Sequence, residues 1–421
     1  MSQRTLTKRL ELVKPGKLLV GIDLAREKNV AVMMNDKARQ IERLRFDHTR
    51  AGYDYLYQRI ERSRVEQESE GVVIGMEPTN YYWKLIAADL EKQHPEYAYR
   101  LVNPYTVRKH REGDQLDRSK DDRRDAFFIA ELLRTGKFTE TQLLHGDYAQ
   151  LRHYGVLDNR LCGDISQVYN WLSNEVAQVF PELPQVFKNP AGETAQALLQ
   201  RHAAAVSIRQ HTLTEFIGRV RADFSGKRLA LSKLREVYAL AGRSVGLSED
   251  WEACQMAIRM HLETLLQLRQ QQAQVAEALV DTFLSLPEAP CLLSIPHIGT
   301  RSAALLLAEI GDPCRFSCAA QLIKLAGTQP VPNLSGRKTR SRTPMSHKGR
   351  ARLRTTLYWI VIRLVNSEPY FQAEYQRLQT RPTHPLTKME ALGVLMNKLL
   401  RIVWALLHNL SLYESQQPRL T

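Results

Sequence analysis

The segment Leu18–Leu24, which reads LLVGIDL, is a run of apolar and β-branched residues that ends in an acid. Such a run is typical of a strand buried on both faces of a sheet. Two more strand patterns follow it after short polar turns, at Val30–Met34 (VAVMM) and at Ile41–Phe46. The three segments together predict a meander of sequential strands.

Helical and strand patterns alternate after the meander. The predicted elements are helices at 53–63, 80–90 and 119–136 and strands at 72–76 (VVIGM) and 97–102. Ser119 is placed as the N-cap and Gly136 as the C-cap of the last helix. Strands separated by helices after an initial meander predict an α/β domain with a mixed sheet, which we assign to residues 1–146.

Residues 147–288 contain almost no strand pattern and are predicted to be helical. A heptad repeat runs through their last part, formed by Trp251, Cys254, Ile258, His261, Leu265, Leu268, Gln272, Val275, Leu279, Thr282 and Leu286. Three polar residues weaken this seam, which leaves two interpretations: a coiled coil between subunits, or one amphipathic helix packed within its own subunit. Pro287 and Pro290 end the helix and mark the next boundary.

Residues 289–421 are predicted to form a mainly α domain. The segment Ile295-Pro-His-Ile-Gly299 is similar to the hairpin of a helix-hairpin-helix, in which a glycine turn lets backbone N–H groups approach a phosphate. Pro-x-x-Gly turns before helices also occur without nucleic acid. The apolar segment Lys388–Ser411 is predicted to be a core helix.

Composition narrows the class of protein. The 421 residues carry 59 Lys and Arg against 45 Asp and Glu, a net charge of +14, which indicates a polyanionic partner: nucleic acid first, an acidic membrane surface second. A disordered chain, a collagen and a small disulfide scaffold are excluded. The chain has no long uncharged apolar stretch and its N-terminus lacks a signal-peptide core, so we expect a cytoplasmic protein that does not enter the membrane.

The positive charge is concentrated between Pro313 and Ser367, a stretch without one Asp or Glu. Its eleven cations are Arg315, Lys324, Arg337, Lys338, Arg340, Arg342, Lys348, Arg350, Arg352, Arg354 and Arg363. A solvated surface normally mixes signs, so this block favours a phosphate-binding surface over an ordinary basic one.

Four acids form a second constellation. Asp23 ends the first strand, Glu77 follows the VVIGM strand, and Asp122 and Asp125 lie three residues apart near the start of a helix. Acids at the carboxyl ends of two strands and on one helical face can converge, and converging carboxylates require cations. The pattern indicates two Mg²⁺ ions that polarise a phosphate.

Each acid also has a structural interpretation. Asp23 can be a turn residue, Glu77 a solvated loop acid, Asp122 the third residue of a capping box, and Asp125 an ion-pair partner of a neighbouring cation. Asp121 lies on nearly the same helical face as Asp125, so spacing alone does not separate it from Asp122.

A serine followed by glycine stands inside the basic block, at Ser335-Gly336. A serine in a positively charged loop can bring its hydroxyl close to a phosphate. Ser-Gly is more often a turn, and Ser341 and Ser346 lie in the same block. From the chemistry alone, the turn is the preferred interpretation.

The chain resembles the DEDD transposases of bacterial insertion sequences, the bridge-RNA-guided serine recombinases. The resemblance is carried by GIDLA around Asp23, GMEPTNYYW around Glu77, Lys120-x-Asp122-x-x-Asp125-Ala126, and the C-terminal stretches SIPHIG, GDPCRF, LAGTQPVP, LSG and SHKGRARLR. These matches are in order and span nearly the whole chain.

The resemblance implies an RNase H-like (RuvC-like) catalytic domain at 1–146, a coiled-coil linker at 147–288 and a transposase domain with the serine at 289–421. It implies that Asp23, Glu77, Asp122 and Asp125 hold Mg²⁺, with Asp121 in a variable position. It also raises Ser335 from a turn residue to the nucleophile that forms a phosphoserine with DNA.

The family further implies donor and target DNA as substrates and a structured guide RNA as partner, in a homodimer or tetramer associated with the bacterial nucleoid. The residues expected to bind nucleic acid are Gly299, Arg337, Lys338, Arg340, Arg342, Lys348, Arg350 and Arg354.

Two positions depart from the family pattern. The family's Ser-Lys-x-Gly stretch is Ser346-His347-Lys348-Gly349 here, which leaves open whether Lys348 or His347 supplies the expected cation. The first glycine of the family's Ile-Pro-Gly-Ile-Gly hairpin is His297.

The predicted function is that of a transposase, a DNA recombinase that cuts and rejoins strands through Ser335 with Mg²⁺ and RNA guidance. Two alternatives remain at this point. One is a RuvC-like junction-resolving nuclease in which water attacks and Ser335 is structural. The other is a basic nucleic-acid-binding protein without catalysis.

Overall fold

The computed structural model describes residues 3–13, 15–78, 81–114, 122–139, 143–226, 228–331, 334–335, 338–339 and 343–414. The chain divides into two compact units, Met1–Leu143 and Leu144–Thr421.

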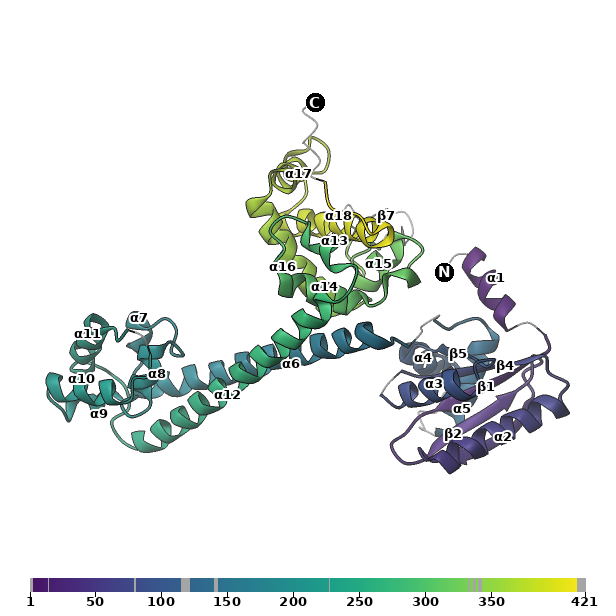
Figure 1. Ribbon diagram of the computed structural model, residues 1–421, viewed down its shortest axis with the longest axis horizontal. Coiled ribbons are helices and arrows are strands. Elements are labelled where there is room, and N and C mark those ends of the chain that lie inside the picture. Colours follow the sequence, from purple (N-terminus) through teal and green to yellow (C-terminus); the bar gives the residue numbers. More distant parts are fainter. Residues whose placement is uncertain are drawn as a thin grey trace. The chain divides into compact units, whose positions relative to one another are not determined.

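The first unit is built on a five-stranded sheet (Figure 1). Its strands are β1 (Lys17–Asp23), β2 (Asn29–Met34), β3 (Gln40–Phe46), β4 (Gly71–Met76) and β5 (Ala98–Leu101), in the spatial order β3-β2-β1-β4-β5. The pairs β1–β2 and β2–β3 are antiparallel, whereas β1–β4 and β4–β5 are parallel. The predicted meander and the predicted mixed α/β sheet are both confirmed.

The chain begins with helix α1 (Gln3–Leu12), which precedes β1. Later helices cover both faces of the sheet. One core contains buried side chains of α2 (Arg50–Glu66) and α3 (Tyr82–Gln93) against the even-numbered residues of β1. The other core contains side chains of α4 (Pro104–Asp114) and α5 (Asp122–Arg134). β1, β2 and β4 are therefore buried on two sides, which explains their apolar runs, whereas the edge strand β3 is mostly exposed or half-buried.

The end of α5 confirms the predicted C-cap. Gly136 adopts φ = +69°, the left-handed conformation that favours glycine, and the N–H of Lys137 donates to the carbonyl of Leu132. The predicted N-cap, Ser119, lies outside the described residues.

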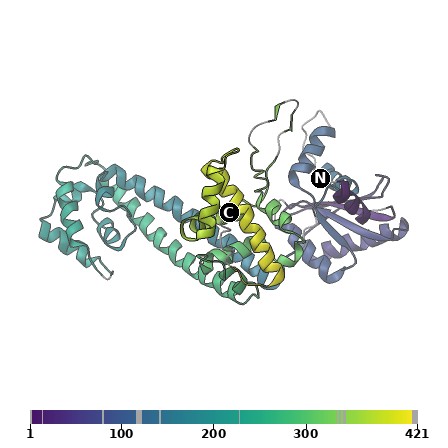
Figure 2. The ribbon, with the colours of Figure 1, turned by 90° about the horizontal axis from the view of Figure 1, so that it is seen from above.

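Two helices of 34 residues, α6 (Gly146–Val179) and α12 (Trp251–Leu284), form the long axis of the second unit. They lie side by side and antiparallel (Figures 1 and 2): Trp171 contacts His261, and Gln272 donates to the Sγ of Cys162. The seam residues of α12 are buried or half-buried along this pair. Of the two interpretations of the heptad repeat, packing within the subunit is the one that this chain adopts on that face.

A lobe of short helices follows α6 and precedes α12. It contains α7 (Leu183–Val186), α8 (Glu193–Leu199), α9 (Ala205–Arg209), α10 (Leu213–Ala222) and α11 (Leu231–Ala241). Its core includes the last turns of α6 and the first turns of α12. The helical middle predicted for residues 147–288 is thus confirmed as helical.

The C-terminal part is mainly helical, as predicted. It contains α13 (Ala289–Leu293), α14 (Thr300–Ile310), the 3₁₀ turn η1 (Pro313–Arg315), α15 (Ala319–Ala326), the strands β6 (Leu334–Ser335) and β7 (Lys338–Thr339), α16 (Ala351–Ser367), α17 (Pro369–Thr380) and α18 (Lys388–Asn409). Leu151, Leu279 and Phe283, from α6 and α12, are buried in the same core as these helices. The boundary between 288 and 289 therefore stays a prediction.

Helix α18 is the predicted core helix. Among the described residues it is the one helix long and apolar enough to cross a membrane by length and composition. Nine of its side chains are buried in the C-terminal core, which is how an apolar helix of this length is normally used in a folded domain.

Candidate functional site

Two glycines bring α5 directly onto the sheet. Gly21 of β1 and Gly75 of β4 are register partners in the parallel pair. A Cβ atom on Gly21 would lie 2.2 Å from the carbonyl oxygen of Ala126, and one on Gly75 would lie 2.7 Å from a methyl group of Leu133. Any side chain at either position would push the helix away, so the two glycines fix α5 over the carboxyl ends of β1 and β4.

Asp23 and Glu77 follow these glycines by two residues each. Strand side chains alternate between faces, and Leu19 and Val73 pack with Ile129 of α5. Asp23 and Glu77 continue the same alternation and reach the α5 face, both half-buried. Ile22 and Met76, the residues just before the two acids, are the last register partners of the parallel pair. Asp23 and Glu77 therefore lie next to each other in the order of the strands, at the same end of the sheet.

The third acid is placed by α5 itself. Asp125 is 7 % exposed and precedes Ala126, the residue whose carbonyl lies over Gly21. Asp23 and Glu77, by strand alternation, and Asp125, by its place on α5, thus belong to the same side of the sheet; their convergence into one site stays a prediction. Asp122 begins the helix three residues earlier, but its side chain is outside the described residues, as is Asp121 altogether.

These acids have the donor chemistry of a divalent-cation site, because carboxylate oxygens are the ligands that Mg²⁺ prefers. Within the described part of the chain, no group of three or more His, Cys, Asp or Glu side chains is close enough to hold a metal ion. The set that can be described lacks Asp122, the fourth predicted ligand. The residue types are those of such a site, while the binding of a cation by all four acids, and the number of ions, stay predictions.

Two residues that the sequence analysis missed hold the backbone around this face. Buried Asn29 accepts from the N–H of Ala25 at 3.0 Å, and the ring of His48 contacts the carbonyl of Ala25 at 3.0 Å. His48 also stacks on Tyr82, at the start of α3, with ring centroids 4.5 Å apart. The loop after Asp23 is thereby tied to the segment that follows Glu77.

The predicted nucleophile, Ser335, lies in a two-stranded hairpin. Ser335 of β6 is paired with Lys338 of β7. Their side chains are outside the described residues, and so are Gly336, Arg337, Arg340 and Arg342 altogether. The pairing nevertheless sets a basic residue directly opposite the serine along the backbone.

A narrow neck closes the loop that carries this hairpin. The backbones of Gly327 and Gly349 are so close that a Cβ on Gly349 would lie 2.4 Å from the nitrogen of Gly327. The N–H of His347 donates to the carbonyl of Gly327 at 2.9 Å, and that of Val331 donates to Pro344. The hairpin therefore projects from a fixed base.

Two of the predicted phosphate-binding arginines help to build that base. One guanidinium nitrogen of Arg354 donates to the carbonyls of Ala326 and Gly349, at 2.9 and 3.2 Å. Arg350 donates to the carbonyl of Glu309, and burial, together with nearby Arg152, lowers the pKa of its guanidinium to about 10. Both side chains have structural partners, while Lys348 is exposed.

The predicted hairpin before α14 is present. His297 adopts φ = +60°, the conformation that favours glycine, and Gly299 is the exposed N-cap residue of α14. Arg301, in the first turn of α14, forms an ion pair with Asp158 of α6, whose carboxylate is almost fully buried. No spacing in the sequence indicates this ion pair, which anchors the start of α14 to the long helix.

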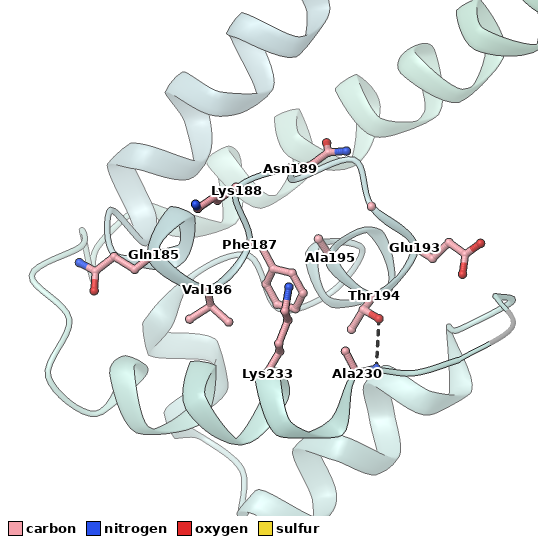
Figure 3. A pocket seen from close by; sticks show the side chains of 11 residues that line it. Gln185, Val186, Phe187, Lys188, Asn189, Glu193, Thr194, Ala195, Ala230 and Lys233 are labelled. Carbon is pink, nitrogen blue, oxygen red and sulfur yellow. Dashed lines mark hydrogen bonds between the residues drawn. The ribbon is translucent and has the colours of Figure 1, made fainter.

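A cavity of about 560 Å³ opens in the helical lobe, and none of the residues that line it is a predicted site residue (Figure 3). The Nζ of Lys233 stacks 5.1 Å above the ring of Phe187, and the hydroxyl of Thr194 accepts from the N–H of Ala230. These contacts are internal packing of the lobe.

Comparison with known families now adds to this geometry. A transposase family model named for DEDD transposases of the IS110 type matches residues 20–181. A second one, described as the transposase IS116/IS110/IS902 family, matches residues 289–376. The chain belongs to the IS110 family of transposases. The first match contains all four predicted acids and the second contains Ser335.

Two relatives of this IS110-family transposase come from Streptomyces coelicolor. An uncharacterised 43.6 kDa protein of insertion element IS110 is 24 % identical over 304 residues, 71 % of this chain and 73 % of the relative. A putative transposase of the IS117 mini-circle is 25 % identical over 336 residues, 76 % of this chain and 77 % of the relative. The family predicted from the motifs is confirmed, and with it an enzymatic transposase.

Proposed function

We propose that this IS110-family transposase recombines DNA through covalent attack by Ser335, with the acids of the first unit serving the same reaction. The proposal is supported by the place of Asp23 and Glu77 at the carboxyl ends of two paired strands, on the side of the sheet where Gly21 and Gly75 let α5, the helix that carries Asp125, pack closely. Carboxylates brought together at such a place are the ligands expected of a metal site for phosphoryl transfer.

An RNase H-like fold is part of this proposal. It is supported by the spatial order β3-β2-β1-β4-β5, by the antiparallel β2, and by α5 packed across β1 and β4. Ligands of open α/β sheets bind at the carboxyl ends of parallel strands, where Asp23 and Glu77 lie.

We propose that Asp23, Glu77, Asp122 and Asp125 hold one or two Mg²⁺ ions. When bound, the metal would stabilise the negative charge that develops on a phosphate. The tied loop of Ala25, Asn29 and His48 keeps Asp23 in position without a rearrangement.

The covalent step belongs to Ser335. Its Oγ attacks the scissile phosphorus and gives up its proton, a phosphoserine bond forms, and the bond from phosphorus to a deoxyribose oxygen breaks, leaving that oxygen as a hydroxyl. A hydroxyl of the exchanging strand then attacks the phosphoserine, restores the phosphodiester and returns a proton to Ser335. The energy of the phosphodiester bond is conserved, which suits a recombinase.

Basic residues near the serine would hold the phosphate backbones. Two candidates belong to the described residues: Lys338, whose backbone pairs with Ser335, and the exposed Lys348. The other candidates, which lie outside the described residues, are Arg337, Arg340 and Arg342. Gly299 would contribute its backbone N–H at the start of α14. The contacts of Arg350 and Arg354 support a role in holding the neck of the loop.

Donor and target DNA, a structured guide RNA, and a homodimer or tetramer acting on nucleoid DNA complete the proposal. The acids belong to the first unit and the serine to the second, so a reaction that uses both requires the units to cooperate, within one chain or between two.

A covalent adduct tests the central step. The purified transposase is incubated with its flanking DNA and Mg²⁺, denatured, and analysed for DNA-linked protein. We expect the adduct from the native protein and from Ser341→Ala, but not from Ser335→Ala. An adduct that persists in Ser335→Ala would remove this serine from the reaction; cleavage without any adduct in both proteins would favour a nuclease that uses water.

Copurified nucleic acid tests the guide. The transposase is purified from cells that carry its flanking DNA, and the bound nucleic acid is sequenced. One discrete structured RNA encoded beside the gene is expected. Heterogeneous RNA, or none, would overturn RNA guidance while leaving the serine chemistry untouched.

A further inference from the structure

One face of α16 combines the half-buried Arg352 and the exposed Arg363 with the exposed indole of Trp359. The opposite face is buried in the C-terminal core through Leu353, Leu357, Ile360, Val361 and Leu364. The outer face presents a single stripe at helical spacing, which we call the α16 stripe: Arg352, Thr355, Thr356, Trp359, Arg363 and Asn366. All six side chains can donate hydrogen bonds, and none is acidic.

Trp359 is the unusual member of this stripe. It is 60 % exposed, the most exposed of the five tryptophans in the chain, although large aromatic side chains normally bury most of their surface. The ring of Tyr358 meets it edge-on, with centroids 5.3 Å apart. An indole held at the surface by its neighbour is a surface on which another planar group can stack.

The charge around Trp359 is of one sign. Arg352 lies seven residues before it and Arg363 four residues after it on the same stripe, within the stretch from 313 to 367 that contains no acid. The next acid, Glu368, is 4 % exposed and uses its carboxylate to cap α17 through the N–H of Phe371. The stretch itself therefore contributes no acid that could offset the cations on the stripe.

We propose that the α16 stripe binds a DNA strand whose bases are unpaired, with a base stacked on Trp359 and phosphates held by Arg352 and Arg363. A protruding indole can stack on the face of a base only where that base is not already stacked in a duplex. Strand exchange creates such bases, so the inference deepens the proposed function and rests on it. Thr356 and Asn366 add neutral donors for phosphate oxygens, whereas the hydroxyl of Thr355 donates to the carbonyl of Ala351 within the helix.

Stacking is tested by binding rather than by catalysis. The full-length transposase is titrated with a short single-stranded DNA and with the blunt duplex of the same sequence, without Mg²⁺. Trp359→Ala is expected to weaken binding of the single strand about tenfold and Trp359→Phe much less, because a benzyl ring still stacks. Binding of the duplex should change little.

The matched control is Trp171→Ala, since Trp171 is 47 % exposed on α6, outside the basic stretch. It should bind both DNAs as the native protein does. Equal loss in the two tryptophan variants, or equal loss for single strand and duplex in Trp359→Ala, would overturn the proposal. A loss confined to single-stranded RNA of the same sequence would assign the stripe to RNA and overturn the DNA assignment.

The arginines are tested by salt. Arg352→Gln and Arg363→Gln should each lower the slope of log affinity against log salt for the single strand by about 0.7, the value for one phosphate contact. An unchanged slope in both would exclude the two arginines. These binding results do not depend on adduct formation, so failure of the Ser335 chemistry and failure of the α16 stripe are separate outcomes.

Discussion

Gly21 and Gly75 lie side by side in two parallel strands, and the helix that carries Asp125 rests directly on both. Neither glycine contributes a chemical group. Their role is to let a helix approach the sheet so closely that an acid on the helix and two acids at the strand ends share one face. The predicted acidic site therefore depends on two strand positions, Gly21 and Gly75, that have no side chain.

Replacing Gly21 with alanine tests this arrangement. The new methyl group would collide with the backbone of α5 at Ala126 and Ala130, so we expect a loss of about 2 to 3 kcal/mol in unfolding free energy and a severe loss of DNA cleavage. Denaturant unfolding and a cleavage assay measure the two effects. Gly163→Ala is the control, since no atom lies within 4 Å of the new methyl group, and a helical Gly→Ala change should stabilise slightly. Equal behaviour of the two variants would contradict the close-approach argument.

Asp122 and Asp121 can be separated by a pair of matched variants. Asp122→Asn removes a charge from a predicted cation ligand and is expected to lower strand cleavage about a hundredfold or more, while Asp121→Asn should be tolerated. Cleavage of flanking DNA at saturating Mg²⁺ is the measurement. The opposite ranking would show that the helical register of the site is shifted by one residue.

Buried His202 should make the helical lobe sensitive to acid. Both ring nitrogens are buried without a hydrogen-bond partner among the described residues, and burial, with the nearby charge of His211, lowers the pKa of His202 to about 4. Because the folded state holds this ring neutral, its contribution to stability is complete above pH 6.5 and is lost as the pH falls towards 4.

The native protein should lose up to about 3 kcal/mol over that interval through this one group. His202→Phe is expected to flatten the dependence of unfolding free energy on pH, measured by chemical denaturation. The same measurement on a variant of exposed His153 provides the comparison. A profile in His202→Phe as steep as in the native protein would assign the acid sensitivity to other groups.

The hairpin before α14 offers a stabilising change. His297 adopts a left-handed backbone conformation, which costs a residue with a side chain about 1 to 2 kcal/mol. Glycine avoids this cost, but part of the gain is offset because glycine also gives the unfolded chain more conformational entropy. His297→Gly should raise the unfolding free energy by up to about 1 kcal/mol. His297→Ala keeps the strained backbone and should not. If alanine stabilises as much as glycine, the imidazole rather than the backbone is responsible.

All five predicted strand segments are observed. β1, β2 and β4 were predictable because burial on two faces leaves a dense apolar signature, and β3 because its apolar and polar residues alternate. Asp23 and Glu77 were predictable for the same reason, since each comes at the end of such a segment. Asn29 and His48 were not, because their role depends on one carbonyl, that of Ala25, and no spacing encodes it.

Charge alone did not distinguish two uses of arginine. Arg350 and Arg354 stand in the basic block like the surface cations, yet they bind main-chain carbonyls at the neck of the loop. The helix that packs against α12 could not be predicted from the sequence either. Its heptad seam predicts an interface, but only the folded chain assigns α6 to it.

The antiparallel pair of α6 and α12 also has a mechanical meaning. Each helix of 34 residues is about 50 Å long, and two such helices packed along their length bend far less than one. The pair therefore acts as a stiff lever with the helical lobe at its tip. A tilt of about 1° at its base displaces the tip by about 1 Å. Small rotations where the pair enters the C-terminal core are thus converted into atomic-scale displacements of the lobe.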